Sequence, residues 1–408
     1  MSHIVPLNVP SLRFPEFSCE WEVKHLSELG IFKSGVGFSE LEQGGNFGVP
    51  FFKVSDMNLA GNEIIMQIAN NFVDQKQIDR LGYKPITSDS VIFAKVGAAI
   101  FLERKRKARN FLIDNNMMAF VPGKELNYDF CFTQFSTIHL SKFAQVGALP
   151  SYNSGDIGII KVGLPTLPEQ QKIAAFLGAV DARAGLLGRR REALRTYKRG
   201  IMQRLFAREL RFTKPDGSLF PDWQEKRLGE VAKFMRGSNL AKGDLDELGQ
   251  FPAIHYGQLF TEYNEIISEV RSTTNRSDCT LSVAGDVLMP SSDVTPDGLA
   301  RGSALHMGGV MLGGDINIIR PSRSIFSNFL SYWITGHKKI FMRLVSGTTV
   351  KHLYISDLKS VSIPLPHPEE QQKIADFLTA LDAKIAAVTA QLNATQAFKK
   401  GLLQQMFV

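Results

Sequence analysis

Cysteine is scarce in this chain of 408 residues, which contains three: Cys19, Cys131 and Cys279. The number is odd and the positions are far apart, so neither a disulfide framework nor a Cys-x-x-Cys metal site is available. We expect these thiols to be buried or inert.

Long apolar runs are also missing. Nowhere do about 18 apolar residues follow one another, as a membrane-spanning helix would require. The first residues lack the basic start and the apolar core of a signal peptide. We therefore expect a cytoplasmic protein with no membrane partner.

Catalytic motifs are absent as well. The sequence contains no GxxxxGK[ST] phosphate loop, no HExxH or Cys/His zinc spacing, and no Asn/Asp-Pro-Pro-aromatic tetrad of an adenine methyltransferase. Glu225 and Lys226 resemble part of a nuclease site, but adjacent residues on a strand point to opposite faces, whereas a metal-gripping pair needs one residue between them. The sequence therefore predicts no catalytic residue and no metal site.

The positive charge of the chain is concentrated in one segment. The formal net charge is +7, and residues 169–211 contain eleven Lys or Arg against four acids, so the rest of the chain is balanced. Such a basic stripe indicates a surface for DNA or for an acidic partner. The alternative is a solvated helix face without a ligand.

An internal repeat organises the sequence. PTLPEQQKIAAFLGAVDA at 165–182 aligns with PHPEEQQKIADFLTALDA at 366–383, and the similarity continues to KRGIMQRLF and KKGLLQQMF. Of 42 aligned positions 17 are identical, whereas chance predicts roughly three. A second echo, WEVKHLSEL at 21–29 and WQEKRLGEV at 223–231, opens each half. The chain is therefore a duplication with a pseudo-two-fold repeat.

The two repeated segments have the pattern of long helices. Apolar residues recur every seven positions, and Pro168 and Pro368 stand at the start, where a helix tolerates proline. We expect the two helices to pack antiparallel as a coiled coil, with a looser contact where Lys198 and Lys399 interrupt the seam. The predicted packing residues are Ile173, Val180, Leu187, Leu194 and Ile201 in the first helix, and Ile374, Leu381, Val388 and Leu402 in the second.

The segments that precede each helix read as strands and loops. Runs such as VPFFKVS, SVIFAKVGAAIF, FPAIHYGQLF, GDVLMP and DINIIRP are rich in Val, Ile and Phe and are bounded by Gly, Asp, Asn and Ser. We predict an α+β fold in which two strand-rich α+β domains, residues 1–164 and 212–365, are separated by two long helices, in residues 165–211 and 366–408.

This arrangement resembles the specificity subunits of type I restriction–modification systems. The resemblance rests on the paired EQQKIA helix starts, the KRGIMQRLF and KKGLLQQMF ends, and the Trp-x-x-Lys-x-Leu openings, and it covers essentially the whole chain. It implies that each α+β domain is a target-recognition domain that reads one half of a bipartite, asymmetric DNA site. The helices are then the spacer between the two readers.

The resemblance also implies partners and cofactors. Double-stranded DNA, two methyltransferase (modification) subunits and motor-nuclease (restriction) subunits are the expected partners. S-adenosylmethionine, ATP and Mg²⁺ are expected in those partner subunits and none of them in this chain, which is the non-catalytic member of the complex. The family often closes its two halves into a ring through the chain ends, but few residues here precede the first repeat motif.

Loop residues that are basic or can bind bases are the candidates for DNA contact. In the first domain they are Lys95, Arg104, Lys105, Arg106, Lys107, Arg109, Ser151, Tyr152 and Asn153. In the second domain they are Arg301, Thr348, Thr349, Lys351 and His352. For each of them the alternative is an ordinary solvated loop residue.

Two other functions stay open at this point. The chain could serve a fused restriction–methylation enzyme as its specificity subunit. It could also be a coiled-coil interaction scaffold that has no role on DNA.

Overall fold

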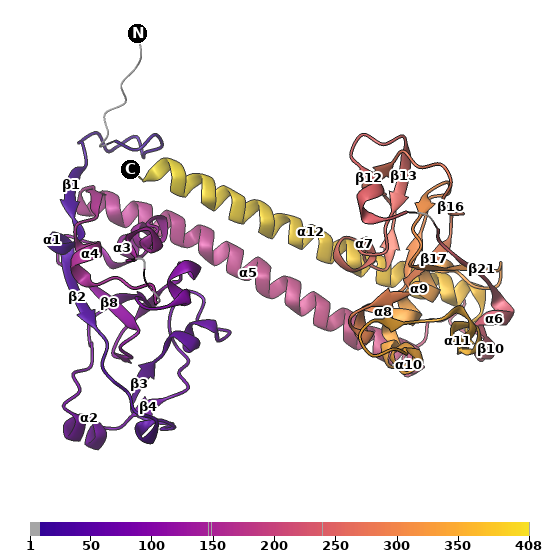
Figure 1. Cartoon of the computed structure of the whole chain (residues 1–408), viewed down its shortest axis with the longest axis horizontal. Coiled ribbons are helices and arrows are strands. Elements are labelled where there is room, and N and C mark those ends of the chain that lie inside the picture. Colours follow the sequence, from indigo (N-terminus) through magenta and orange to yellow (C-terminus); the bar gives the residue numbers. More distant parts are fainter. Residues whose placement is uncertain (1–8, 146, 148, 239, 408) are drawn as a thin grey trace, which may run out of the picture. The chain divides into compact units, whose positions relative to one another are not determined.

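The computed structural model describes residues 9–145, 147, 149–238 and 240–407. The chain divides into two compact units, residues 1–187 with 391–408 and residues 188–390. Each unit combines one strand-rich domain with parts of two long helices, which Figure 1 labels α5 and α12. Within the described ranges, no helix is both long enough and apolar enough to cross a bilayer.

The first domain is built on a four-stranded antiparallel sheet with the order β2-β8-β5-β6. A three-stranded sheet (β4-β3-β7) and the β1-β9 pair complete its strands. The strands are β1 (Glu22–His25), β2 (Gly30–Ser34), β3 (Val49–Phe52), β4 (Phe72–Val73), β5 (Ser90–Ala94), β6 (Lys105–Ala108), β7 (Leu112–Ile113), β8 (Met117–Pro122) and β9 (Lys161–Leu164). The helices are α1 (Leu26–Leu29), α2 (Gln75–Leu81), α3 (Tyr128–Thr137) and α4 (Ser154–Gly158), with 3-10 turns η1 (Glu40–Glu42), η2 (Val54–Asn58), η3 (Ala98–Leu102) and η4 (Leu140–Phe143).

The second domain has a five-stranded sheet (β11-β21-β17-β19-β14), a second one (β12-β15-β13-β20-β16), and the pairs β10-β23 and β18-β22. Its strands are β10 (Gln224–Arg227), β11 (Ala232–Arg236), β12 (Leu245–Asp246), β13 (Phe251–Ile254), β14 (Ile266–Ile267), β15 (Ser272–Thr274), β16 (Thr280–Leu281), β17 (Asp286–Pro290), β18 (Ser292–Asp293), β19 (Ser303–Leu305), β20 (Met311–Leu312), β21 (Ile316–Pro321), β22 (Lys351–His352) and β23 (Ser362–Leu365). Its helices are α6 (Leu228–Val231), η5 (Lys242–Asp244), α7 (Gln258–Thr261), α8 (Pro296–Leu299), α9 (Ser327–Gly336), α10 (Lys338–Leu344) and α11 (Ile355–Ser360).

The central strands of the two domains have the same register. β2 pairs with β8 so that Ser34 lies opposite Met118, and β11 pairs with β21 so that Arg236 lies opposite Asn317. β5 and β17 likewise pair antiparallel with β8 and β21. The strands predicted from VPFFKVS, SVIFAKVGAAIF, FPAIHYGQLF, GDVLMP and DINIIRP are β3, β5, β13, β17 and β21. In two of these runs the strand is shorter than predicted, because the second run continues into the 3-10 turn η3 and the third into the helix α7. The duplication inferred from the helices therefore extends to domains whose sequences have diverged.

α5 (Leu167–Phe206) and α12 (Pro368–Met406) are single uninterrupted helices. In the first unit, the start of α5 shares a core with the end of α12 through Ile173, Leu177, Leu402 and Met406. In the second unit, the end of α5 shares a core with the start of α12. Because opposite ends meet, the helices run antiparallel in both units. The predicted fold class, with an internal repeat and two long antiparallel helices, is confirmed.

The heptad residues lie largely inside. Of the residues expected to pack, Val180 and Leu194 are half-buried and the others are buried. The predicted loose contact at Lys198 does not occur, because this side chain is only 9% exposed and its Nζ donates to Asp382 Oδ1 at 2.7 Å. Lys399 pairs in the same way with Asp181, at 2.6 Å. Each seam lysine therefore binds an aspartate of the opposite helix.

The repeated EQQKIA sequence begins both helices with a buried glutamate. Glu169 is fully buried and accepts hydrogen bonds from Arg13 Nε at 2.6 Å and Trp21 Nε1 at 3.2 Å. A second bond from Arg13 Nη2, at 2.7 Å, makes the pair bidentate. Glu370 is held in the same way by Arg211 and Trp223. The pairing satisfies a carboxylate that would otherwise be costly to bury.

The following glutamine ties each helix to its domain. Gln170 Oε1 accepts from the backbone of Asn127 at 2.7 Å, and its Nε2 donates to the carbonyls of Glu125 and Pro165. Gln371 makes the equivalent bonds to Ser324 and Phe326, in the segment before α9, and to the carbonyl of Pro366, just before α12. The repeated EQQKIA sequence therefore supplies the side chains that attach each helix to its domain.

The N-terminal segment contacts the last turn of α12. The backbone N–H of Leu12 donates to Gln405 O at 2.9 Å, and the Ser11 hydroxyl donates to the same oxygen at 3.2 Å. In the second unit Leu210 donates to Arg204 O, at the matching position of α5. The ring closure considered from the sequence depends also on residues 1–8 and 408, which lie outside the described residues.

Candidate functional site

In the first domain, two candidate loops meet where β5 ends. The Lys95 N–H donates to Asn116 O at 2.8 Å, and the Tyr152 N–H donates to Lys95 O at 3.2 Å. Ser151 forms a β-bridge with Val96. The structure thus brings together Lys95 and the segment Ser151–Asn153, which are more than fifty residues apart in the sequence.

Three side chains of this segment have different surroundings. Tyr152 is buried, its hydroxyl donates to Ala94 O at 2.5 Å, and burial raises its pKa. Asn153 is exposed and caps α4 by accepting from the N–H groups of Gly155 and Asp156. Ser151 is half-buried. Tyr152 and Asn153 therefore shape the loop through contacts within the domain, and any role on DNA stays a prediction.

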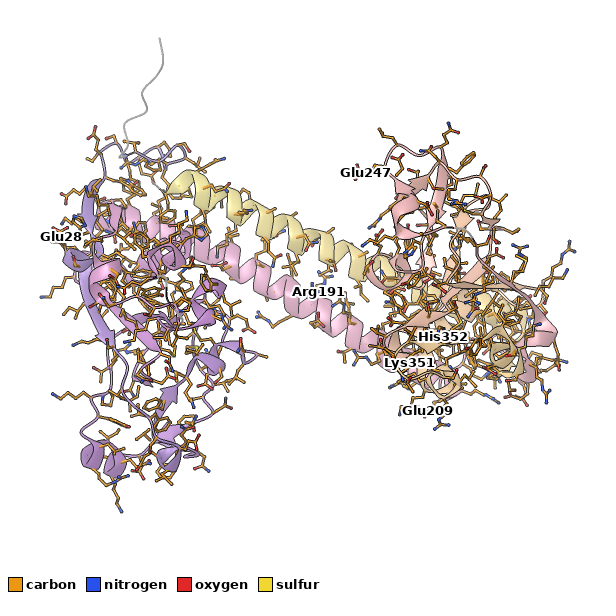
Figure 2. The ribbon with its side chains drawn as sticks, in the orientation of Figure 1. Glu28, Arg191, Glu209, Glu247, Lys351 and His352 are labelled. Atoms are coloured by element: carbon orange, nitrogen blue, oxygen red, sulfur yellow. The ribbon has the colours of Figure 1, made fainter. Side chains whose placement is uncertain are left out.

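The loops of the second domain are arranged in the same way. The Ser291 N–H donates to Asp315 O at 2.8 Å, and the Leu353 N–H donates to Ser291 O at 3.0 Å. Lys351 and His352 form β22, which pairs with β18, and Figure 2 shows them next to each other. Lys351 Nζ donates to Gly347 O at 2.6 Å, whereas Thr348 and Thr349 are exposed in the turn between them.

The basic run 104–107 lies on or just before β6 and is engaged within the domain. Lys105 is buried, pairs with Glu103 at 2.5 Å and donates to Ile138 O at 2.8 Å, and burial lowers its pKa. Arg106 donates to Lys105 O and, at 3.4 Å, to Met57 O, and burial lowers its pKa too. Lys107 pairs with Asp129. These contacts do not connect the run with the loop at Lys95.

Arg109 and Arg104 complete the run. Arg109 is exposed and lies 3.8 Å from Asp89. Arg104 donates to Asn58 Oδ1, at the end of η2. In the second domain Arg301 donates to the carbonyls of Phe260 and Tyr263, on and just after α7. Arg104 and Arg301 therefore contact the helical turns that follow β3 and β13, respectively.

Two residues at the strand ends were not predicted from the sequence. Ser34 ends β2, and its Oγ lies 3.4 Å from Lys95 Nζ. Arg236 ends β11, and its Nη2 donates to Ser291 Oγ at 3.1 Å and lies 3.5 Å from Asp315 Oδ1. No local motif marks either residue, because their neighbours come from strands distant in the sequence.

No group of three or more His, Cys, Asp or Glu side chains among the described residues is placed to hold a metal ion. Of the cysteines, Cys131 is buried, and burial raises its pKa, whereas Cys19 is exposed.

Comparison with known proteins gives consistent similarities. The family described as the type I restriction modification DNA specificity domain matches residues 19–196 and again 221–395. A putative type I restriction enzyme MjaX specificity subunit from Methanocaldococcus jannaschii is 23% identical, over 97% of this chain and 95% of that protein. The type I restriction enzyme MjaVIII specificity subunit of the same organism is 25% identical over 60% of each chain.

Solved structures show the same fold. The crystal structure of a type I restriction-modification S subunit from M. genitalium superimposes with a TM-score of 0.63 at 15% identity, covering 98% of this chain and 99% of that one. A chain from a structure that concerns complex assembly of a type I R-M system has a TM-score of 0.55 at 20% identity, covering 95% and 96%.

Proposed function

Because the chain belongs to the type I restriction modification DNA specificity family, whose domain occurs in it twice, we propose that it is the DNA-reading subunit of a type I restriction–modification complex. Each recognition domain reads one half of a bipartite DNA site, and the chain itself catalyses nothing. The second half of the site differs from the first, because the two domains differ at the loops beside β5 and β17.

One observation carries this proposal: the two domains share strand register while the side chains at their strand ends differ. Lys95 occupies the position after β5, and Ser291 the position after β17. Ser151 bridges to the first loop, and His352 pairs with the second. A common frame with exchanged side chains is what two readers of different sequences require, since hydrogen bonds to base edges provide the choice of sequence.

The long helices have two roles in this proposal. α5 contains 40 residues, so at 1.5 Å per residue it extends for about 60 Å. A rod of that length sets the number of unread base pairs between the half-sites, which must lie near a helical turn of DNA, roughly 34 Å, or more apart. The helices and domains also dock two methyltransferase subunits, and restriction subunits with motor and nuclease activity join them. S-adenosylmethionine, ATP and Mg²⁺ are bound by those partners.

Mapping methylated adenines in the host genome, with and without this gene, tests the proposal. We expect one bipartite, non-palindromic motif to lose methylation when the gene is deleted and to regain it when the gene is restored. A coiled-coil scaffold without a role on DNA would leave the methylation pattern unchanged. An identical pattern in both strains, with the neighbouring methyltransferase expressed, would contradict the proposed function.

A further inference from the structure

The shared register allows positions of the two domains to be matched one by one at the ends of the central strands. Lys95 and Ser291 follow β5 and β17, and each donates its N–H to the carbonyl of the residue just before β8 or β21. Gly35 donates to Met117 O and Gly237 donates to Ile316 O, the first residues of β8 and β21. Lys95 therefore matches Ser291.

The same register also matches Ser34 with Arg236, which are the residues that precede Gly35 and Gly237. A Cβ added to Gly35 would lie 1.8 Å from a backbone oxygen, and one added to Gly237 would lie 2.0 Å from another. Both glycines are thus places where two backbones approach closely, which supports the alignment. Each domain presents one cation and one serine at this spot, but the two residues have exchanged strands.

The contacts at the spot are alike. Lys95 Nζ lies 3.4 Å from Ser34 Oγ in the first domain, and Arg236 Nη2 lies 3.1 Å from Ser291 Oγ in the second. Exchange of the cation between strands, with the charge kept in place, indicates that the position of the charge matters more than the residue that carries it.

The positive charges of Lys95 and Arg236 contribute little to the stability of the fold. Among the described residues, no carboxylate lies within ion-pairing distance of Lys95. Arg236 has Asp315 at 3.5 Å, but both side chains are about half exposed, and exposed pairs of this kind contribute little to folding. Neither cation is held by a buried carboxylate, so each can bind a ligand at the surface.

We propose that Lys95 and Arg236 bind a DNA phosphate at the same place in the two recognition domains. This inference rests on the proposed function. Two domains that read different bases still contact the same sugar-phosphate backbone, which is common to all DNA sequences. A positive charge that is present in both domains is therefore suited to bind a phosphate. The neighbouring loops at Ser151 and His352, which differ, then face the bases.

Salt dependence of DNA binding separates this role from a structural one, because each neutralised phosphate contributes about 0.9 to the slope of log affinity against log salt. The experiment uses the full-length chain and a mixed-sequence duplex of about 40 base pairs, with affinity measured between about 50 and 200 mM NaCl. We expect Arg236→Ser to lower the slope by about 1. Arg227→Ser, at an exposed arginine of β10, is the matched control and should leave the slope unchanged.

A variant that moves the cation from one strand to the other tests the proposal more directly. Lys95→Ser should also lower the slope by about 1, and the double variant Lys95→Ser/Ser34→Arg, which copies the arrangement of the second domain, should restore it. Ser34 is exposed, so arginine fits there without repacking. Thermal unfolding verifies that each variant folds.

The outcomes are distinct. Unchanged slopes for both single variants, or no recovery in the relocated variant, would overturn the phosphate assignment while leaving the proposed function in place. Failure of the unaltered chain to bind the duplex at any of these salt concentrations would contradict the proposed function itself.

Discussion

Glu169 and Glu370 explain why the same six residues open both long helices. Each glutamate is fully buried and receives a bidentate arginine and a tryptophan N–H. The pair sits at the N-terminus of its helix, where a negative charge also meets the positive end of the helix dipole. A carboxylate in this position is satisfied only if all partners are present, so the motif and its distant arginine depend on each other.

Replacing Glu169 by Gln should destabilise the first unit by about 3 kcal/mol, because the variant leaves the Arg13 charge in a largely buried site without its counter-ion. Urea unfolding followed by intrinsic fluorescence measures the change. Glu22→Gln is the control: Glu22 is exposed and lies 3.2 Å from Lys24, so its loss should cost at most about 0.5 kcal/mol. Equal effects of the two variants would contradict the role assigned to the buried pair.

His337 makes the second unit sensitive to acid. Its ring stacks on Trp333 with centroids 4.5 Å apart, and burial lowers its pKa below the ordinary value. The folded state then binds a proton less readily than the unfolded chain, so the stabilisation is complete above the unfolded pKa of about 6.5 and is lost as the pH falls through the lowered pKa. The second unit should therefore lose stability as the pH is lowered from about 7 to about 5.

Unfolding midpoints measured across that pH range should depend less on pH in His337→Gln than in the unaltered chain, because glutamine does not titrate. His139→Gln, at an exposed position outside the core, is the control and should keep the original pH dependence. An unaltered pH profile in His337→Gln would contradict the assignment.

At the scale of elements, the lysines in the heptad seams are determinants of the helix pairing. Lys198 binds Asp382 through both carboxylate oxygens, and Asp382 also accepts from the Tyr332 hydroxyl at 2.7 Å. Burial raises the pKa of Asp382. The Lys399–Asp181 pair is the repeat of this contact, and both of its side chains are about a quarter exposed. Paired charges inside an apolar seam favour one helix register, since a slip would leave each charge buried without a partner.

Replacing Lys198 by Leu should lower the free energy of unfolding by about 2 kcal/mol, because the partly buried carboxylates of Asp382 and Glu265 then lose the cation that both of them contact. The double variant Lys198→Leu/Asp382→Leu should recover part of that loss, since two apolar side chains can replace an ion pair in the seam, whereas Glu265 stays without its cation. Lys399→Leu, at the more exposed pair, should cost about 1 kcal/mol. A double variant as unstable as the single one would show that the two residues do not act as a pair.

At the scale of the whole molecule, the duplication gives the chain two domains with one strand frame, and the continuous helices connect them along the chain. In the proposed function these two domains are the readers of the half-sites. Lengthening the helices should therefore change the spacing of the half-sites without changing the bases read. A matched insertion in both helices is required, since each seam pair joins α5 to α12: four residues between 181 and 198 and four between 382 and 399 preserve both Lys–Asp pairs.

An insertion of four residues adds about one helical turn, or about 6 Å, which corresponds to about two base pairs of DNA. Methylation mapping should show a longer unread spacer flanked by the original half-sites. The same insertion in the exposed turn at Gly217 is the control and should leave the spacer as it was. A changed half-site in the helix variant would contradict the ruler role.

The sequence alone determined the duplication, the two long helices and their antiparallel pairing, the strand-rich class of both domains, and the family. These features depend on local or repeated signals: heptad spacing, strand-forming runs, and a helix-start motif that occurs twice. The individual DNA contacts predicted from the sequence stay predictions.

Only the tertiary structure showed which residues occupy equivalent positions in the two domains. Ser34 and Arg236 differ by 202 positions, whereas Lys95 and Ser291 differ by 196, because the loops between the strands have different lengths. No single offset aligns both pairs, and strand register, which the hydrogen bonds across the sheet set, is required to match them. For the same reason the seam lysines look like defects in the sequence, since the aspartates that bind them lie on the opposite helix.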